Sequence, residues 1–182
     1  MTKPAFLEKT SKEKRLLLII RVLTLFFIGA LVVSGATAFP LESELKLLCS
    51  MLGISTDVPY DSYTGFHGFI AYVYTGIVDT NAKYPFLAYG TDWLAFAHIV
   101  IAIAFIGVFV KPVRNIWIVY WAMIACIAVI PTVIICGVVR GIPFYWQLVD
   151  CSFGVFGIIP LLVLLYYIKQ LAKTIGYTPS EY

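Results

Sequence analysis

The sequence predicts an all-α integral membrane protein with four transmembrane helices, and three observations lead to this prediction. The chain of 182 residues is 61% hydrophobic and only 13% charged, a composition that lipid accommodates better than a water-soluble core does. Its ionisable residues become rare inside four long apolar stretches and return at their ends. These stretches approach or exceed the roughly 20 residues that a helix needs to cross a bilayer, whereas barrel strands are shorter and alternate in polarity.

The predicted spans cover residues 16–39, 93–110, 116–139 and 151–168, and together with their connections they form a single membrane domain over residues 1–182. The first apolar stretch also resembles a secretory signal peptide, because a basic segment precedes it and the small residues Ala36, Thr37 and Ala38 end it. We expect this stretch to be retained as a span, since it leads into Phe39 and Pro40, a pair that suits the end of a helix.

The segment between the first two spans, residues 40–92, is predicted to form an outer cap that contains short amphipathic or interfacial helices. A helix over residues 42–52 would place three leucines on one face, namely Leu45, Leu48 and Leu52. The aromatic-rich stretch over residues 63–79 is too short to span a membrane. Its tyrosines favour the depth at which the bilayer meets water, so an interfacial helix or a lid is expected there.

The distribution of lysine and arginine predicts that both termini are cytoplasmic, because cytoplasmic segments of membrane proteins carry the excess of positive charge. Basic residues gather before the first span, between the second and third spans and after the fourth, at Lys3, Lys9, Lys12, Lys14, Arg15, Lys111, Arg114, Lys169 and Lys173. The two remaining connections hold three basic residues against seven acidic ones. Outside the N-terminal segment there is no basic patch, so nucleic-acid binding is not expected.

The four cysteines do not form a recognisable disulfide or metal framework, because no pair is separated by two residues. Cys126 and Cys136 are ten residues apart on one predicted helix, about 15 Å, which is too far for a bridge. One bridge among Cys49, Cys136 and Cys151 remains an alternative, since all three are predicted near the outer face. The simpler expectation is that all four cysteines are buried thiols that pack as small apolar groups.

Polar residues that could carry chemistry are predicted to converge at the outer end of the helices. The candidate binding or proton-relay cluster consists of Asp92, His98, Arg140 and Asp150, with His67 in the preceding connection. His98 lies six residues beyond Asp92, about 9 Å deeper along the helix axis. An ionisable group at membrane depth is a functional candidate, although a neutral histidine bonded to a neighbouring helix is the simpler interpretation. For the three charged residues, an ion-pair cluster and a binding site are equally compatible with the pattern.

Small residues predict where helices pack closely in the membrane. Ala95 and Ala102 share the predicted face of His98, and Gly154 and Gly157 follow Asp150 along one face of the last span. Small side chains at this spacing allow two helix backbones to approach each other. These four residues are therefore the candidates for helix packing.

Several motifs with a known chemical mechanism are absent from the sequence. It contains no histidine-glutamate metal motif, no phosphate-binding glycine loop, no nucleophile elbow and no paired-cysteine redox motif. No metal or cofactor is predicted. A b-type haem held by His67 and His98 is the disfavoured alternative, because one histidine is expected in a loop and the other several residues deep in a span.

Three sequence strings resemble a group of small, uncharacterised bacterial inner-membrane proteins. The first runs from Ala88 to His98 (AYGTDWLAFAH) and the second from Pro112 to Trp117 (PVRNIW). The third has two parts, Arg140 to Trp146 and then Asp150 to Gly154, which reads DCSFG. The resemblance covers the C-terminal half of the chain well and the first span and its following segment poorly. It implies a bacterial source and a four-helix membrane fold. It implies no activity, because none is established for the group.

Two functional interpretations follow from the sequence. In the first, the chain is a non-catalytic membrane component, either an oligomer-forming bundle or an accessory subunit, whose partners are lipid and itself or another membrane protein. In the second, the cluster of Asp92, His98, Arg140 and Asp150 binds or acts on a lipid headgroup, a quinone or a small anion. The first is favoured because it requires no catalytic residue that the sequence lacks. The sequence leaves open whether the chain is an enzyme.

Overall fold

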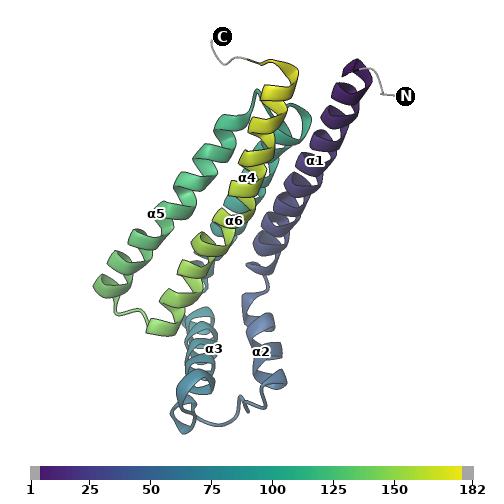
Figure 1. Ribbon diagram of the computed structural model, residues 1–182. Coiled ribbons are helices and arrows are strands. Elements are labelled where there is room, and N and C mark those ends of the chain that lie inside the picture. Colours follow the sequence, from purple (N-terminus) through teal and green to yellow (C-terminus); the bar gives the residue numbers. More distant parts are fainter. Residues whose placement is uncertain (1–4, 178–182) are drawn as a thin grey trace. The chain divides into compact units, whose positions relative to one another are not determined.

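The computed structural model describes residues 5–177, with side chains from residue 10 onward. Lys3 and the side chain of Lys9, which belong to the predicted cytoplasmic segment, lie outside the described residues. All regular structure between residues 5 and 177 is helical (Figure 1). The α-helices are α1 (Ala5–Thr37), α2 (Leu41–Met51), α3 (Gly65–Lys83), α4 (Tyr89–Val110), α5 (Ile116–Arg140) and α6 (Phe144–Ile175), with short 3₁₀ helices η1 (Tyr60–Ser62) and η2 (Pro85–Ala88).

Four of these helices are long and apolar enough to cross a membrane, which confirms the predicted all-α class and the number of spans. They cover Thr10–Thr37, Pro85–Val110, Ile116–Arg140 and Phe144–Ile175. The last helix begins seven residues before the predicted span over residues 151–168. The charge of Asp150 suggested that the helix starts at this residue. The first turns of α6 nevertheless accommodate polar side chains, because Gln147 and Asp150 both form hydrogen bonds there.

The chain divides into two compact units. The first unit comprises the residues up to 30, residues 102–142 and the residues from 146 onward, and the second comprises residues 31–101 and 143–145. Helices α1 and α4 each contribute residues to both units.

Tightly packed helices form the first unit. Its fully buried side chains come from all four long helices and include Ile20, Thr24, Phe105, Val108, Val119, Leu161, Leu164 and Ile168. The rings of Phe27 and Phe105 lie 4.6 Å apart between their centres, which joins α1 to α4. The hydroxyl of the buried Thr24 donates to the carbonyl of Ile20 on its own helix at 2.7 Å, so that this hydroxyl has a partner inside the apolar core.

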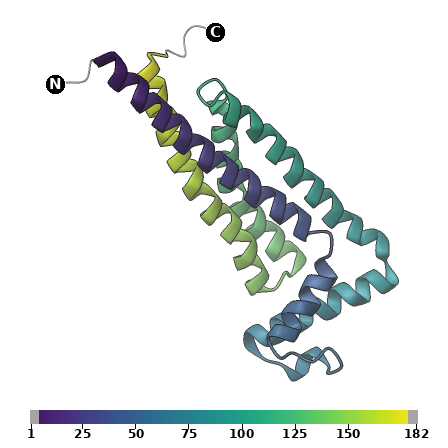
Figure 2. The same cartoon turned by 90° about the vertical axis from the view of Figure 1, so that its right-hand side faces the viewer.

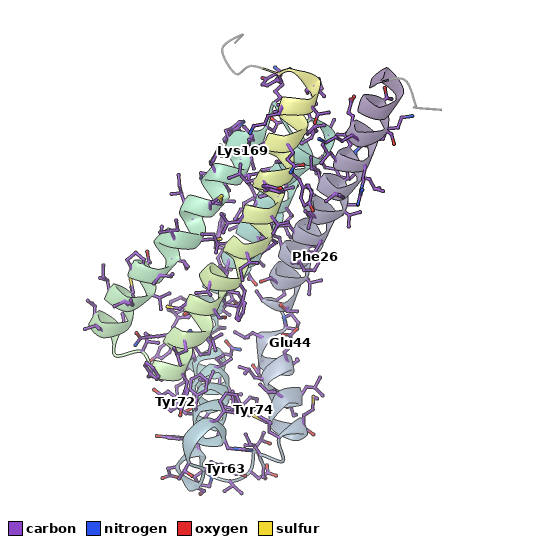
Figure 3. All side chains as sticks on the ribbon, viewed as in Figure 1. Phe26, Glu44, Tyr63, Tyr72, Tyr74 and Lys169 are labelled. Carbon is purple, nitrogen blue, oxygen red and sulfur yellow. The ribbon has the colours of Figure 1, made fainter. Side chains whose placement is uncertain are left out.

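Helices α5 and α6 run side by side in the first unit (Figure 1). A tight turn joins them and is closed by Gly141, which adopts a left-handed conformation with φ of 62° that favours glycine. The N–H of Ile142 donates to the carbonyl of Gly137 at 2.9 Å, as in a Schellman motif. Further along the pair, the ammonium of Lys169 on α6 lies 5.6 Å from the ring centre of Tyr120 on α5 (Figure 3).

A glutamine side chain also stabilises the turn between α5 and α6. The amide of Gln147 on α6 donates to the carbonyl of Ile142 at 2.8 Å. Its side chain lies so close to the backbone of Gly137 that a Cβ atom at this position would overlap it. Glycine at position 137 therefore provides the space in which Gln147 reaches the turn.

The second unit contains a pair of short helices, α2 and α3, which contact each other (Figure 2). The amide of Asn81 on α3 donates to the carboxylate of Glu42 on α2 at 2.8 Å. Tyr63, directly ahead of α3 (Figure 3), accepts a hydrogen bond at its hydroxyl from the N–H of Ser55 at 2.9 Å. The segment between the first two spans thus has defined structure, with α2 within one residue of the predicted helix over residues 42–52.

Candidate functional site

The five residues of the predicted cluster belong to two different units of the chain. Asp92, His98 and His67 lie in the second unit, whereas Arg140 and Asp150 lie in the first. The prediction that all of them form one site stays a prediction.

Asp92 borders a cavity in the second unit. The cavity has a volume of about 450 Å³ and is lined by Phe39, Tyr89, Asp92, Trp93 and Phe96. Asp92 stands in the first turn of α4, where the partial positive charge of the helix N-terminus favours a carboxylate. Phe39 comes from the connection between α1 and α2, so the cavity joins two segments that are about fifty residues apart in the sequence.

The aromatic rings beside Asp92 contact one another edge to face. The ring centres of Tyr89 and Trp93 lie 6.4 Å apart, and those of Trp93 and Phe96 lie 5.7 Å apart with an interplanar angle of 89°. All four aromatic residues that line the cavity are largely exposed. Among the described side chains, Asp92 has no hydrogen-bond or ion-pair partner. The cavity thus combines aromatic surface with one unpaired carboxylate and no basic side chain in its lining.

His98 is half-buried on α4. Its Nδ1 atom lies 2.8 Å from the carbonyl oxygen of Leu94, one turn earlier on the same helix. A carbonyl can only accept, so Nδ1 carries the hydrogen and donates it. The expected bond to a neighbouring helix is therefore replaced by one within α4, because the carbonyl four residues back is within reach of the ring. In the neutral ring, Nε2 keeps its lone pair.

Gly35 is a packing residue that the sequence analysis missed. A Cβ atom at Gly35 on α1 would lie 3.0 Å from the carbonyl oxygen of Ala95 and 3.1 Å from Cβ of His98. Ala95 itself is completely buried. The run of small residues Ser34, Gly35 and Ala36 was the signal for this contact, but only the overlapping Ala36, Thr37 and Ala38 were interpreted, as an imitation of the end of a signal peptide. Within the first unit, Ala102 is also buried.

Arg140 and Asp150 do not form an ion pair in the part of the chain that the structure describes. Arg140 is the exposed last residue of α5. The carboxylate of Asp150 instead accepts a hydrogen bond from the indole of Trp146, one turn earlier on α6. Asp150 therefore lies inside α6 rather than at its start, which corrects its predicted position.

His67 is exposed in the first turn of α3. The loop position assumed for it in the haem alternative is wrong, whereas a helix within residues 63–79, one of the two expected forms of this segment, is present as α3. The helix begins at Gly65, which adopts a left-handed conformation with φ of 60°, and it continues through His67 to Lys83. The described side chains contain no group of three histidine, cysteine, aspartate or glutamate residues close enough to hold a metal ion.

Gly154 and Gly157 on α6 face the neighbouring helix α5 of the same chain. A Cβ atom at Gly154 would overlap the carbonyl oxygen of Cys126 and lie 2.6 Å from a methyl carbon of Val129. At Gly157 the nearest atom is the sulfur of Cys126, at 3.1 Å. This glycine face is therefore occupied by the chain's own α5 and is not free for another partner.

The four cysteines are free thiols with different exposure. Cys49 on α2 is completely buried, and this burial raises the pKa of its thiol. Cys126 and Cys151 are half-buried, but Cys136 is exposed on α5. The expectation of four buried thiols is wrong for Cys136, because it stands in the last two turns of α5, where Ile134, Ile135 and Val138 are exposed as well.

Comparison of this chain with protein-family models, with curated proteins and with solved structures finds no match. The resemblance to small bacterial inner-membrane proteins accordingly stays a prediction.

Proposed function

We propose that this chain is a non-catalytic integral membrane component that associates, through the free side of α5, with a second copy of itself. The observation that carries the proposal is a row of small residues on this helix. Ala128, Thr132 and Cys136 are spaced by four residues and are all exposed, although they lie on a helix long and apolar enough to cross a membrane. Small side chains at this spacing let another helix approach closely, whereas bulky apolar residues suffice against lipid.

The row begins opposite the side of α5 that contacts α6. Ala128 is two residues beyond Cys126, the residue that contacts Gly154, so it lies about 200° further around the helix axis. Each step of four residues turns the row by about 40° more, so that Cys136 is exposed at the edge of the α5–α6 contact. The hydroxyl of Thr132 donates to the carbonyl of Ala128 at 2.8 Å. Its polar group is therefore satisfied within the helix and adds no cost to an apolar contact. In a two-fold symmetric dimer the same surface of both subunits is in contact, so this row could pack against the same row of a second copy, which favours a second copy as the partner.

The membrane and the orientation are part of the same proposal: a bacterial inner membrane with both termini in the cytoplasm. The charge of the two units supports the orientation. The sequence of the first unit, which contains both termini, has eleven basic residues against four acidic ones, whereas the second unit has two lysines against six carboxylates. Excess positive charge marks the cytoplasmic side of a membrane protein.

Oxidative cross-linking in native membranes tests the proposed contact, because Cys136 lies within the row and is exposed. A disulfide requires the two Cα atoms to come within about 7 Å. We expect treatment with a copper-phenanthroline oxidant to convert the chain of 20.3 kDa into a species of twice that mass. Variants that carry cysteine at position 128 or 132 instead, Ala128→Cys and Thr132→Cys in a Cys136→Ser background, extend the test along the row.

The matched control is Ile127→Cys in the same background, since Ile127 is exposed on α5 but lies outside the row. Cross-linking through the row and not through position 127 supports the contact. If none of the three row positions yields a dimer, or if position 127 cross-links as readily as they do, association through this face is refuted.

A further inference from the structure

We propose that the cavity around Asp92 binds the ammonium group of an organic cation. The lining of this open cavity carries the inference, because it places one carboxylate beside the rings of Phe39, Tyr89, Trp93 and Phe96. This site is independent of the proposed contact through α5. It also differs from the sequence-based alternative, because it takes a positively charged group and does not use Arg140, Asp150 or His98, none of which lines the cavity.

The side chains that line the cavity favour a ligand with a positive charge. The face of an aromatic ring carries partial negative charge and attracts a cation that lies within about 6 Å of its centre, and tryptophan does so most strongly. Rings that meet edge to face, as Trp93 does with Tyr89 and with Phe96, present their faces in different directions around a shared space. A carboxylate at the border of that space adds a direct Coulomb attraction.

The charge of the whole second unit acts in the same direction. Its two lysines and six carboxylates give a formal charge of −4. A surface with this excess concentrates cations near the cavity and repels anions. An anion would in addition meet no basic side chain in the lining. The sign of the ligand is thus indicated both by the nearest groups and by their surroundings.

The same lining favours an organic cation over a metal ion. Calcium and magnesium require several oxygen ligands, and Asp92 is the only carboxylate that borders the cavity. A methylated ammonium group instead uses aromatic and apolar surface, which makes up most of this lining. The open cavity has a volume of about 450 Å³, which is more space than a choline-sized group needs, so the group would lie against the rings with one side uncovered.

Such an ammonium group could belong either to a free solute or to a phospholipid headgroup. We therefore measure binding of radiolabelled choline to the full chain, purified in a non-ionic maltoside detergent, by scintillation proximity. Unlabelled tetramethylammonium and a short-chain phosphatidylcholine serve as competitors, and sodium chloride of equal ionic strength controls for screening. We expect saturable choline binding that tetramethylammonium displaces. Displacement by phosphatidylcholine at much lower concentration would identify the lipid as the source of the group.

Asp92→Asn tests the carboxylate, because it keeps the shape of the side chain and removes its charge. We expect it to weaken binding about tenfold or more, and Trp93→Leu to do the same through loss of the ring. The matched control is Asp79→Asn, which removes the same charge from an exposed residue of the same unit that does not line the cavity. This control should retain choline affinity within about twofold.

Two outcomes would overturn the proposal. One is the absence of saturable binding of both choline and the short-chain lipid, which would leave the four rings as an ordinary aromatic belt at the membrane surface. The other is an affinity that falls equally in Asp92→Asn and Asp79→Asn, which would trace any binding to the overall charge of the unit. A thermal unfolding profile like that of the unaltered chain shows that each variant is folded.

Discussion

At the scale of single residues, His98 shows how an apolar helix accommodates a polar ring. Its Nδ1–H group donates to the carbonyl of Leu94 on the same helix at 2.8 Å. That carbonyl has two lone pairs and already accepts the backbone N–H of the helix, so it can accept both donors. No neighbouring helix is needed to satisfy Nδ1. The ring is therefore secured by α4 itself, and its removal leaves no backbone group without a partner.

This geometry predicts that His98→Leu is tolerated. The variant loses one hydrogen bond, a net contribution of about 1 kcal/mol, and gains an apolar side chain at a half-buried position of a membrane helix. We expect a free energy of unfolding within about 1 kcal/mol of the unaltered chain, measured by thermal or detergent-induced unfolding. The matched control is Ala95→Leu, which places a large side chain at a completely buried position against Gly35 and should destabilise strongly. A severe folding defect in His98→Leu would show that its Nε2 atom has an essential partner.

At the scale of elements, the contact between α5 and α6 depends on the absence of side-chain atoms at Gly154. A Cβ atom at this position meets the backbone oxygen of Cys126, and a backbone atom cannot move aside without shifting the helix. At Gly157 the nearest atom is the sulfur of Cys126, which can rotate about its side-chain bond. The two glycines therefore differ in how much of the contact depends on them.

Gly154→Ala is accordingly expected to destabilise the chain by about 1 to 3 kcal/mol, the usual cost of overpacking, while Gly157→Ala should cost less. Gly29→Ala is the matched control, since a Cβ atom at Gly29 on α1 meets nothing within 4 Å and alanine favours a helix. Reversible unfolding in detergent measures all three variants under the same conditions. Equal stability of Gly154→Ala and Gly29→Ala would contradict the close approach of α5 and α6.

The elements themselves were predictable from the sequence to different degrees. The four spans follow from length and hydropathy, because a bilayer requires about 20 apolar residues whatever their neighbours are. The start of α6 did not follow, because a polar residue such as Gln147 is placed in a helix only once its partner, the carbonyl of Ile142, is known. The sequence left His67 either in a helix within residues 63–79 or in a loop, because hydropathy alone does not show that α3 starts at the left-handed Gly65.

At the scale of the whole molecule, the candidate site was only partly visible in the sequence. Asp92 was found because a charge beside an apolar stretch is conspicuous. Phe39 was not, since its place in the cavity depends on how the connection after α1 folds. Exposed aromatic residues near span ends also have a common alternative role in the membrane interface. Only the shared cavity distinguishes the rings around Asp92 from other aromatic residues of the chain.

The division of charge between the units leads to a prediction about the whole molecule, namely its orientation in the membrane. Four spans return the chain to the side from which it started, so both termini share one side, and the excess of lysine and arginine around them favours the cytoplasm. The segment that contains η1 should then lie on the opposite side. Ser11 on α1 and Ser62 in η1 are both exposed and suitable for labelling.

We expect Ser62→Cys, in a background in which the four native cysteines are replaced by serine, to react with a membrane-impermeant maleimide on intact cells. Ser11→Cys should react only after the membrane is opened, because its basic neighbours Lys12, Lys14 and Arg15 favour the cytoplasmic side for that end. Full labelling of both variants after detergent treatment controls for reactivity. The reverse pattern would overturn the orientation. It would also place the acidic second unit and its cavity on the cytoplasmic side, where the organic cation would have to come from the cell interior.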